Sequence, residues 1–382
     1  EPITHFDASK FKTQFACEVK NFNAEDYFDR KEARKLDPYA QYALVTATEA
    51  WADSGLDEET INNDRAGVIW GSGIGGLKTF YDECTEFASG DGTPRFNPFF
   101  IPKMIADIAA GHISMKWNLR GPNFTTVSAC ASSTNSLIDS FNYIRLGQAD
   151  IIVSGGSEAA VTQAGVGGFN AMRALSQRND SPETASRPFD LDRDGFVLGE
   201  GSGCLIVEEL EHALARGAKI YAEIGGGGMS ADAHHITAPH PEGLGAINVM
   251  RNVLRDAGMQ PSEIDYINVH GTSTPLGDVA ESKAIREVFG EEAFNLNISS
   301  TKSMTGHLLG AAGAIEAIAC VMAVQDGIVP PTINHFTDDP EFNSQLNFTF
   351  NKAQKRIVNA ALSNTFGFGG HNASVIVKKF VQ

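Results

Sequence analysis

One cysteine and two histidines in this sequence combine into a set that could form and break a thioester. Cys130 lies in the run Val127-Ser-Ala-Cys-Ala-Ser-Ser, whose pattern predicts a strand end, a tight turn and the start of a helix. A cysteine at a helix N-terminus faces unpaired backbone N–H groups and the positive end of the helix dipole, which lower the pKa of the thiol. The sequence therefore predicts that Cys130 is a nucleophile that attacks a carbonyl or a thioester.

The two histidines share one topological setting. His270 ends an apolar strand and opens the run His-Gly-Thr-Ser-Thr-Pro, and His307 ends the run Lys-Ser-Met-Thr-Gly-His before a Gly/Ala-rich helix. Both therefore lie in predicted strand-to-helix turns at the carboxyl edge of a sheet, where active sites collect. Neutral imidazoles there can donate Nε2–H bonds to a carbonyl oxygen that becomes negative as an enolate forms. Either histidine alone is typical of a structural residue, but together with Cys130 they indicate a condensation that forms a carbon–carbon bond.

Two charged residues accompany this set. Lys302 lies five residues before His307 and could hold a carboxylate or change the pKa of that imidazole. Glu316, on the following helix, could pair with Lys302. A purely structural ion pair explains both residues equally well.

A glycine-rich segment near the C-terminus could supply the remaining group. The run Asn364-Thr-Phe-Gly-Phe-Gly-Gly-His-Asn372 has glycines that let the backbone approach a ligand closely. A backbone N–H from this turn and the N–H of Cys130 would form an oxyanion hole for a thioester carbonyl. A simple hairpin turn fits the glycines as well but leaves two exposed aromatic residues unexplained.

The elements that position these residues alternate between strands and helices. In the first half, the pattern predicts strands over 66–70, 123–127, 151–154 and 203–208. It predicts helices over 37–53 and 131–146, and a short helix over 210–216 that ends at Gly217. The second half predicts strands over 220–224, 266–270, 296–299, 360–363 and 373–378 and helices over 245–257, 278–288 and 310–325. This order predicts an α/β fold with two similar halves, residues 1–217 carrying the cysteine and residues 218–382 carrying the histidines.

Composition limits the possible functions. The chain has 382 residues, 42% of them hydrophobic and 20% charged, a balance typical of a globular protein. We find no stretch of about eighteen uncharged apolar residues, and we expect no membrane span. A formal charge of −17 argues against nucleic acid as a partner. Five scattered cysteines without metal-binding spacing, and no signal segment, favour a reducing cytoplasm and no metal or other cofactor.

One basic patch stands out in this acidic chain. Arg30, Lys31, Arg34 and Lys35 have a spacing that places them on roughly one face of a predicted helix. A solvated helix face and a docking site for an acidic partner explain this pattern equally well.

These motifs strongly resemble the β-ketoacyl-acyl-carrier-protein synthases of fatty-acid synthesis, and most of all the elongating type II enzymes. The resemblance extends over nearly the whole length. It rests on the Cys130 segment, the run beginning at Gly165, the run from Ser186 to Gly201, the two histidine motifs and the run Gly367-Phe-Gly-Gly.

The resemblance implies the duplicated, thiolase-like α/β/α/β/α layered fold, a homodimer, and condensation of a Cys130-bound acyl chain with malonyl-carrier-protein. It also implies site residues. Lys302 and Glu316 support the site, Phe368 is a gate over the acyl tunnel, and Ile74 and Phe169 line that tunnel. We also expect Thr272 and Thr274 to bind substrate, and the four residues of the basic patch to dock the acyl carrier protein.

Two features depart from the family pattern. His371 stands where the family commonly has threonine, and an expected N-terminal strand with a Thr-Gly-rich turn is absent before Glu1. Neither removes a residue of the proposed chemistry.

Other functions remain as alternatives. A ketosynthase of a dissociated polyketide pathway shares the same residues. A non-catalytic partner subunit would lack the nucleophile, which this chain keeps. A dinucleotide-binding oxidoreductase would use Gly71–Gly76, which matches GxGxxG after a strand, but the chain has no clear acidic residue about twenty positions further on.

Overall fold

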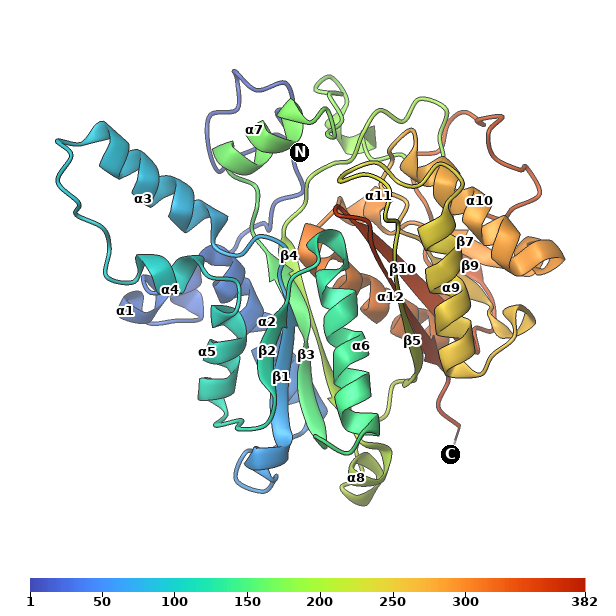
Figure 1. Ribbon diagram of the computed structural model, residues 1–382, viewed down its shortest axis with the longest axis horizontal. Coiled ribbons are helices and arrows are strands. Elements are labelled where there is room, and N and C mark those ends of the chain that lie inside the picture. The colour runs from blue at the N-terminus through green and yellow to red at the C-terminus, as the bar shows by residue number, and fades with distance from the viewer. Residues whose placement is uncertain (382) are drawn as a thin grey trace.

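A computed structural model describes residues 1–381 of the chain (Figure 1). Its helices are α1 (Arg30–Ala33), α2 (Pro38–Ser54), α3 (Leu77–Ser89), α4 (Phe100–Met104), α5 (Ile108–Lys116), α6 (Ser132–Arg145), α7 (Gln163–Ala171), α8 (Leu210–Ala215), α9 (Leu244–Ala257), α10 (Gly277–Phe289), α11 (Lys302–Thr305) and α12 (Ala312–Asp326). Its strands are β1 (Ala66–Gly71), β2 (Asn123–Thr126), β3 (Ile151–Glu158), β4 (Gly201–Glu208), β5 (Glu223–Ala231), β6 (Tyr266–Asn268), β7 (Asn297–Ser299), β8 (Ile328–Val329), β9 (Gln354–Lys355), β10 (Ala360–Gly367) and β11 (His371–Lys378).

The two main sheets have matching topologies. The first has the order β2-β1-β3-β4, with β4 antiparallel to β3 and the other pairs parallel. The second has the order β7-β6-β10-β11-β5, and its first four strands repeat the directions of the first sheet. The chain therefore consists of two halves with the same sheet topology. Strand β5 is additional, because it has no counterpart in the first sheet among residues 1–381.

The sheets and helices form five layers. Helices α2 and α5 cover the outer face of the first sheet, and α9 packs on the second sheet with α10 beside it (Figure 1). Between the sheets lie α6, which contacts β1 and β3 as well as β5 and β11, and α12, which contacts β4 and β10. The layered α/β/α/β/α fold expected from the sequence is confirmed.

The two central helices cross so closely that a glycine is required. A Cβ built on Gly313 of α12 would lie 2.0 Å from Oγ1 of Thr134 on α6. This close crossing matters for the site, because each central helix begins at the turn that carries a predicted catalytic residue.

Strand β5 differs from the expectation. We predicted a strand over 220–224, whereas the strand covers Glu223–Ala231 and includes four consecutive glycines. The reason is steric, because β5 lies between α6 and α9. A Cβ on Gly227 would lie 2.7 Å from Ile138 Cγ2, and one on Gly228 would lie 2.6 Å from the backbone nitrogen of Val253.

Two further elements differ in length. The C-terminal glycine-rich turn is shorter than predicted, since β10 runs to Gly367 and β11 starts at His371. The basic helix is only one turn, Arg30–Ala33, because Asp29 caps its start and the next helix begins at Pro38, with Asp37 as its cap.

Our expectation that no stretch is long and apolar enough to span a membrane was wrong for one segment. Leu309–Asp326 has 18 residues with a mean hydropathy of 1.4, and 67% of it is buried inside the fold. It corresponds largely to the central helix α12, and its apolarity follows from packing between two sheets.

Candidate active site

The turn before α6 places Cys130 at the centre of the molecule. Strand β2 ends at Thr126, and Cys130 is the middle residue of a single 3₁₀ turn, Ala129–Ala131, that leads into α6. Ala129 has a φ of 51°, an unfavourable value for a residue with a side chain. Such strain is retained where the surrounding structure fixes the chain, often at functional sites.

The fold brings both histidines to Cys130. His307 follows α11, and its Nε2 lies 3.0 Å from the Sγ of Cys130. His270 follows β6, and its ring lies edge-on to that of His307 with centroids 5.2 Å apart. The Sγ of Cys130 and one ring nitrogen from each histidine all lie within 4.8 Å of one another. The three residues therefore lie within reach of one small substrate group.

Burial sets the protonation of these groups. Burial, with a further contribution from the Lys302 charge, lowers the pKa of His270 and of His307 well below the ordinary value, so both imidazoles are neutral at pH 7. Burial also raises the pKa of Cys130 to about 12, although the Lys302 charge and backbone N–H groups oppose the rise.

This contradicts our expectation of a lowered thiol pKa at Cys130. The helix terminus is present, but the loss of water around a thiol that is only 5% exposed outweighs it. Cys130 is therefore a thiol at rest, and it needs a base to become a nucleophile.

Two backbone N–H groups oppose the rise in the pKa of the Cys130 thiol. They belong to Phe368, in the turn between β10 and β11, and to Cys130 itself. The turn comes this close because residue 367 is glycine, where a Cβ would lie 2.7 Å from the carbonyl oxygen of Ser128. An oxyanion hole would use two backbone N–H groups of this kind beside the reacting sulfur.

Lys302 and Glu316 form a buried ion pair beside these groups. Lys302 Nζ donates to Glu316 Oε1, and the two side chains are 2% and 1% exposed. Burial raises the pKa of Glu316 to about 7, against the lowering effect of the Lys302 charge. The sequence suggested this pairing, and the structure contains it.

Two glutamates that the sequence analysis missed fix the loops around the site. Glu281 on α10 accepts hydrogen bonds from the backbone N–H groups of His270, at 2.9 Å, and Gly271, at 2.8 Å. Glu158 at the end of β3 accepts from the N–H groups of Gly73, at 2.8 Å, and Gly310, at 3.0 Å. Nothing in the local sequence marks either residue, because glutamate is ordinarily exposed.

The glycine-rich loop after β1 is not free to bind a phosphate. Besides Gly73, the N–H of Ile74 donates to Glu158, at 3.2 Å, and the N–H of Gly75 donates to the hydroxyl of Ser72. The amides that would cradle a pyrophosphate are therefore already bonded within the protein. This local structure opposes the oxidoreductase interpretation of the GxGxxG pattern.

A cavity of about 510 Å³ leads to the cysteine. Cys130, His270, His307, Thr272, Thr274 and Phe368 all line it. Ile74 and Phe169 do not line this cavity, although the ring of Phe169 lies 6.5 Å from that of Phe368. Their place in an acyl tunnel stays a prediction.

Arg173, which the sequence analysis also missed, is an arginine that lines the cavity. It is exposed, has a φ of 57°, and makes no ion pair with the residues that the structure describes. An unpaired guanidinium in a strained position at a cavity is typical of an anion contact.

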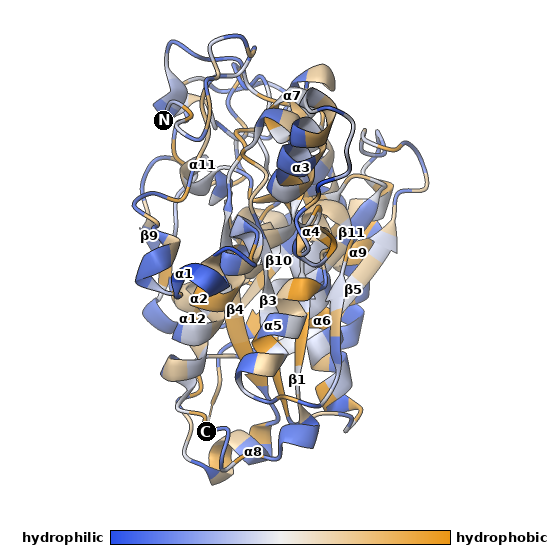
Figure 2. Cartoon of the chain, turned by 90° about the vertical axis from the view of Figure 1, so that its left-hand side faces the viewer, coloured by the Kyte–Doolittle hydropathy of each residue, from blue (hydrophilic) through white to orange (hydrophobic). Residues whose placement is uncertain are grey.

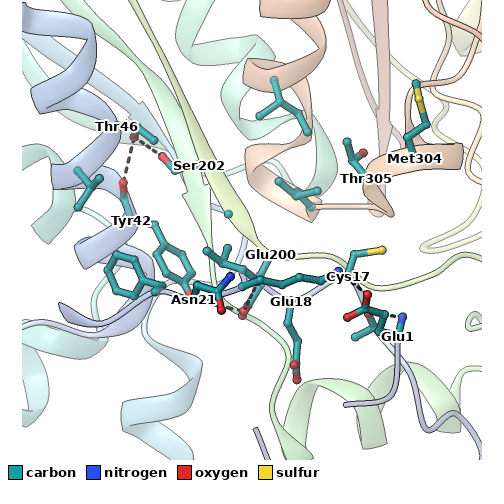
Figure 3. A pocket seen from close by; sticks show the side chains of 18 of the residues that line it. Glu1, Cys17, Glu18, Asn21, Tyr42, Thr46, Glu200, Ser202, Met304 and Thr305 are labelled. Atoms are coloured by element: carbon teal, nitrogen blue, oxygen red, sulfur yellow. Dashed lines mark hydrogen bonds and ion pairs between the residues drawn. The ribbon is translucent and has the colours of Figure 1, made fainter. Parts of the chain in front are cut away.

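A second cavity, of about 560 Å³, lies away from the cysteine (Figure 3). Figure 3 shows Tyr42 and Thr46 of α2 on one side and Met304 and Thr305 of α11 on the other, with Glu200 between them. The Thr46 hydroxyl lies 2.7 Å from that of Ser202 at the start of β4. Cys130, His270 and His307 do not line this cavity.

A thiol with a nearby imidazole, a second imidazole and backbone N–H groups beside the sulfur is the set of groups that an acyl-transferring condensing enzyme uses, here on a duplicated thiolase-like fold. The sequence profile described as "Beta-ketoacyl synthase, N-terminal domain" matches residues 2–213, and the profile "Beta-ketoacyl synthase, C-terminal domain" matches residues 221–336. The chain therefore belongs to the β-ketoacyl synthase family.

Individual relatives agree with this assignment. The 3-oxoacyl-[acyl-carrier-protein] synthase 2 of Staphylococcus aureus (strain COL) is 50% identical over 380 residues, which cover 100% of this chain and 91% of the relative. The enzyme of the same name from Coxiella burnetii is 48% identical, covering 99% of this chain and 91% of its own.

Solved structures share the fold. A β-ketoacyl synthase from Burkholderia phymatum superimposes with a TM-score of 0.91 at 35% identity, over 98% of this chain and 91% of that one. A type II polyketide ketosynthase, in complex with its acyl-carrier protein and bound to a hexaketide, superimposes with a TM-score of 0.88 at 33% identity, over 98% of this chain and 90% of that one.

Proposed function

We propose that this protein joins a Cys130-bound acyl chain to malonyl-acyl-carrier-protein, giving a β-ketoacyl-carrier-protein in fatty-acid elongation. The observation that carries the proposal is the 3.0 Å contact between His307 Nε2 and Cys130 Sγ, two residues that line a cavity. Relatives named for this reaction are 48–50% identical over their shared length, whereas the polyketide ketosynthase is 33% identical, which favours the fatty-acid pathway.

In the first half reaction, Cys130 takes the acyl group from its carrier. The sulfur attacks the thioester carbonyl while its proton moves to His307 Nε2. The N–H groups of Phe368 and Cys130 stabilise the tetrahedral oxyanion. The carrier thiolate then leaves and takes the proton from His307, so the products are a Cys130 thioester and a free carrier thiol.

In the second half reaction, malonyl-carrier-protein loses CO₂ at the same site. The bond to the carboxylate breaks, and the electron pair forms an enolate whose oxygen accepts Nε2–H bonds from His270 and His307. The enolate carbon attacks the Cys130 thioester, and the sulfur leaves as a thiolate that takes up one proton from solvent.

Nε2 of His307 must accept a proton in the first half reaction, whereas in the second it must already carry a hydrogen and donate a hydrogen bond to the enolate oxygen. The Nδ1 atoms of His270 and His307 are buried and have no hydrogen-bond partner within residues 1–381. Because the partner of the second nitrogen normally fixes the tautomer, neither ring is held in one form. The same imidazole can therefore serve both steps.

The exposed basic patch supports docking of an acidic carrier protein. Arg30, Lys31, Arg34 and Lys35 are all exposed, and Figure 2 shows α1 as a hydrophilic segment at the surface. Lys35 also lies 5.4 Å from the ring centroid of the exposed Phe99. Reversing Lys31 and Lys35 to glutamate should raise KM for carrier-bound donors, with the largest effect at low salt.

An apolar arm and an open sheet edge support the homodimer. Helix α3 extends away from the body of the fold together with α4 (Figure 1). Phe80 and Phe87 on α3 are 47% and 41% exposed, and Phe96 and Phe99 of the following loop are 39% and 41% exposed. Strand β2 also forms an edge of the first sheet. A second copy would cover these surfaces, and light scattering of Phe80→Glu against wild type tests the assembly.

We also propose the division into halves at 217/218, because the first sheet takes its strands from residues before this point and the second from residues after it. A cytoplasmic location follows from the proposed substrates. Neither statement changes the chemistry.

The direct test mixes the protein with a long-chain acyl-carrier-protein and malonyl-carrier-protein. Intact-mass analysis should show an acyl adduct that Cys130→Ala abolishes, and product analysis should show a β-ketoacyl carrier. A folded protein that gives neither adduct nor product with donors of several chain lengths would instead support the non-catalytic partner subunit.

A further inference from the structure

The three side chains around the cysteine also have the types and the spacing of a group that could hold a metal ion. Among residues 1–381, Cys130, His270 and His307 are the one group of three or more histidine, cysteine or acidic residues whose donor atoms lie within 4.8 Å of one another. We propose that these three residues bind Zn²⁺ or a similar divalent cation as a reversible inhibitor, in competition with acylation of Cys130.

The ligand types suit zinc. A thiolate and two imidazoles leave a fourth position open for water, which is the usual pattern of a three-ligand zinc site. Bonds of about 2.0–2.3 Å in a tetrahedron place ligand atoms roughly 3.5 Å apart. The Cys130–His307 contact of 3.0 Å must lengthen by roughly 0.5 Å to reach this separation, and the remaining ligand-atom distances, which are within 4.8 Å, must shorten by up to roughly 1.3 Å.

The ion has a route to the site. All three residues line the 510 Å³ cavity, so a hydrated cation reaches them by the substrate route. When the metal binds, the proton of the Cys130 thiol must leave so that the thiolate can be a ligand. That proton goes to solvent or buffer.

Two features make the ion an inhibitor rather than a resident cofactor. Metal-binding histidines normally donate their other N–H to a carboxylate or carbonyl group, but Nδ1 of His270 and of His307 has no such partner within residues 1–381. The buried ammonium of Lys302 also acts on both imidazoles and repels a cation. Affinity should therefore be moderate and reversible.

The proposed reaction predicts which step the metal blocks. Once Cys130 is acylated, its sulfur is a poor ligand, and two imidazoles remain. A protein that has been acylated beforehand should therefore resist the metal, whereas the free protein should not acylate in its presence. This part rests on the proposed function, but metal binding itself does not.

Cobalt provides a readout that does not depend on activity. Adding CoCl₂ to the EDTA-treated protein should produce near-ultraviolet thiolate-to-cobalt absorption and the visible bands of four-coordinate Co²⁺, and Zn²⁺ should remove both. Cys130→Ser should abolish the near-ultraviolet band. His270→Asn and His307→Asn should each weaken binding by about tenfold or more. Cys84→Ser, which changes a cysteine on α3, should leave the spectrum unchanged.

Activity then tests the inhibition. Zn²⁺ should block formation of the acyl adduct, EDTA should restore it, and Mg²⁺ at the same concentration should have no effect. Circular dichroism of each variant shows that it is folded. The proposal is overturned if the folded wild type gives no cobalt spectrum, or if the spectrum and the inhibition survive in both histidine variants. A cobalt spectrum in a protein without condensing activity would retain this site and reject the proposed function.

Discussion

Nε2 of His307 lies 3.0 Å from Sγ of Cys130, although 177 residues separate the two in the sequence. The cysteine lies in the turn before the central helix of one half, and the histidine precedes the central helix of the other. Because these two helices pack against each other between the sheets, the two turns meet. The active site therefore depends on the packing of both halves.

This contact predicts the effect of removing the imidazole at position 307. We expect His307→Asn to slow acylation of Cys130 by about 10²–10⁴-fold, the usual contribution of a general base. Because the pKa of Cys130 is raised to about 12, the residual rate of the variant should increase with pH up to the limit of protein stability. Rapid-quench mass spectrometry measures the adduct, and His112→Asn on α5 is the matched control. Equal acylation rates would contradict the role of His307.

The exposed arginine at the cavity predicts a specific binding defect. Arg173→Ala should raise KM for carrier-bound donors, whose arm carries a phosphate, and leave KM for a short acyl thioester without phosphate unchanged. Lys352→Ala, which changes an exposed lysine elsewhere on the surface, serves as the control. If both kinds of donor are affected equally, Arg173 supports the structure of the cavity instead.

Buried glutamates predict how stability changes with pH. Burial raises the pKa of Glu158 and of Glu281 to about 7, above the ordinary value of 4.5. Between these values the folded state binds more protons than the unfolded state, so this contribution to the free energy of unfolding falls as pH rises from 4.5 through 7. The contribution of each glutamate to the free energy of unfolding is at most roughly 3 kcal/mol.

The two buried histidines also affect how the free energy of unfolding changes with pH. Because burial lowers the pKa of His270 and His307, their contribution rises with pH, opposite to that of the glutamates. The measurement therefore compares wild type with a variant that lacks one glutamate. Urea unfolding of wild type and Glu158→Gln should be compared at pH 5 and pH 8. The variant should be more stable relative to wild type at pH 8 than at pH 5. A difference that does not depend on pH would contradict the raised pKa.

The close crossing of the central helices predicts a packing defect. In Gly313→Ala the added methyl group would lie 2.0 Å from Thr134 Oγ1, so the helices must separate or rotate. We expect a loss of about 1–3 kcal/mol in the free energy of unfolding, with slower acylation because both catalytic turns adjoin these helices. Gly111→Ala on α5 has no atom within 4 Å of the new Cβ and should be neutral or slightly stabilising. Calorimetry of the two variants compares them directly.

Much of the layout could be predicted from local patterns. The strand Ala66–Gly71, the helix Pro38–Ser54 and the strand-to-helix turns at Cys130 and His307 follow from hydrophobic periodicity, helix caps and glycines close to them in the sequence. The five-layer order came from the family resemblance. The glycine strand β5 was largely missed, because only the helices on either side make glycine necessary there.

The sequence by itself determined which chemical groups are present and in which turns they lie, because turn chemistry and strand or helix periodicity are short-range properties. Only the tertiary structure decided the state of those groups. Burial by residues from both halves raises the pKa of Cys130, which its helix terminus alone would lower. Glu281 and Glu158 accept hydrogen bonds from backbone N–H groups of the loops around the site. They do so because packing removes their carboxylates from water and leaves these N–H groups as partners. The distances between these groups and their removal from water depend on residues far apart in the chain. Only the tertiary structure therefore determines how the groups of the separate motifs act together.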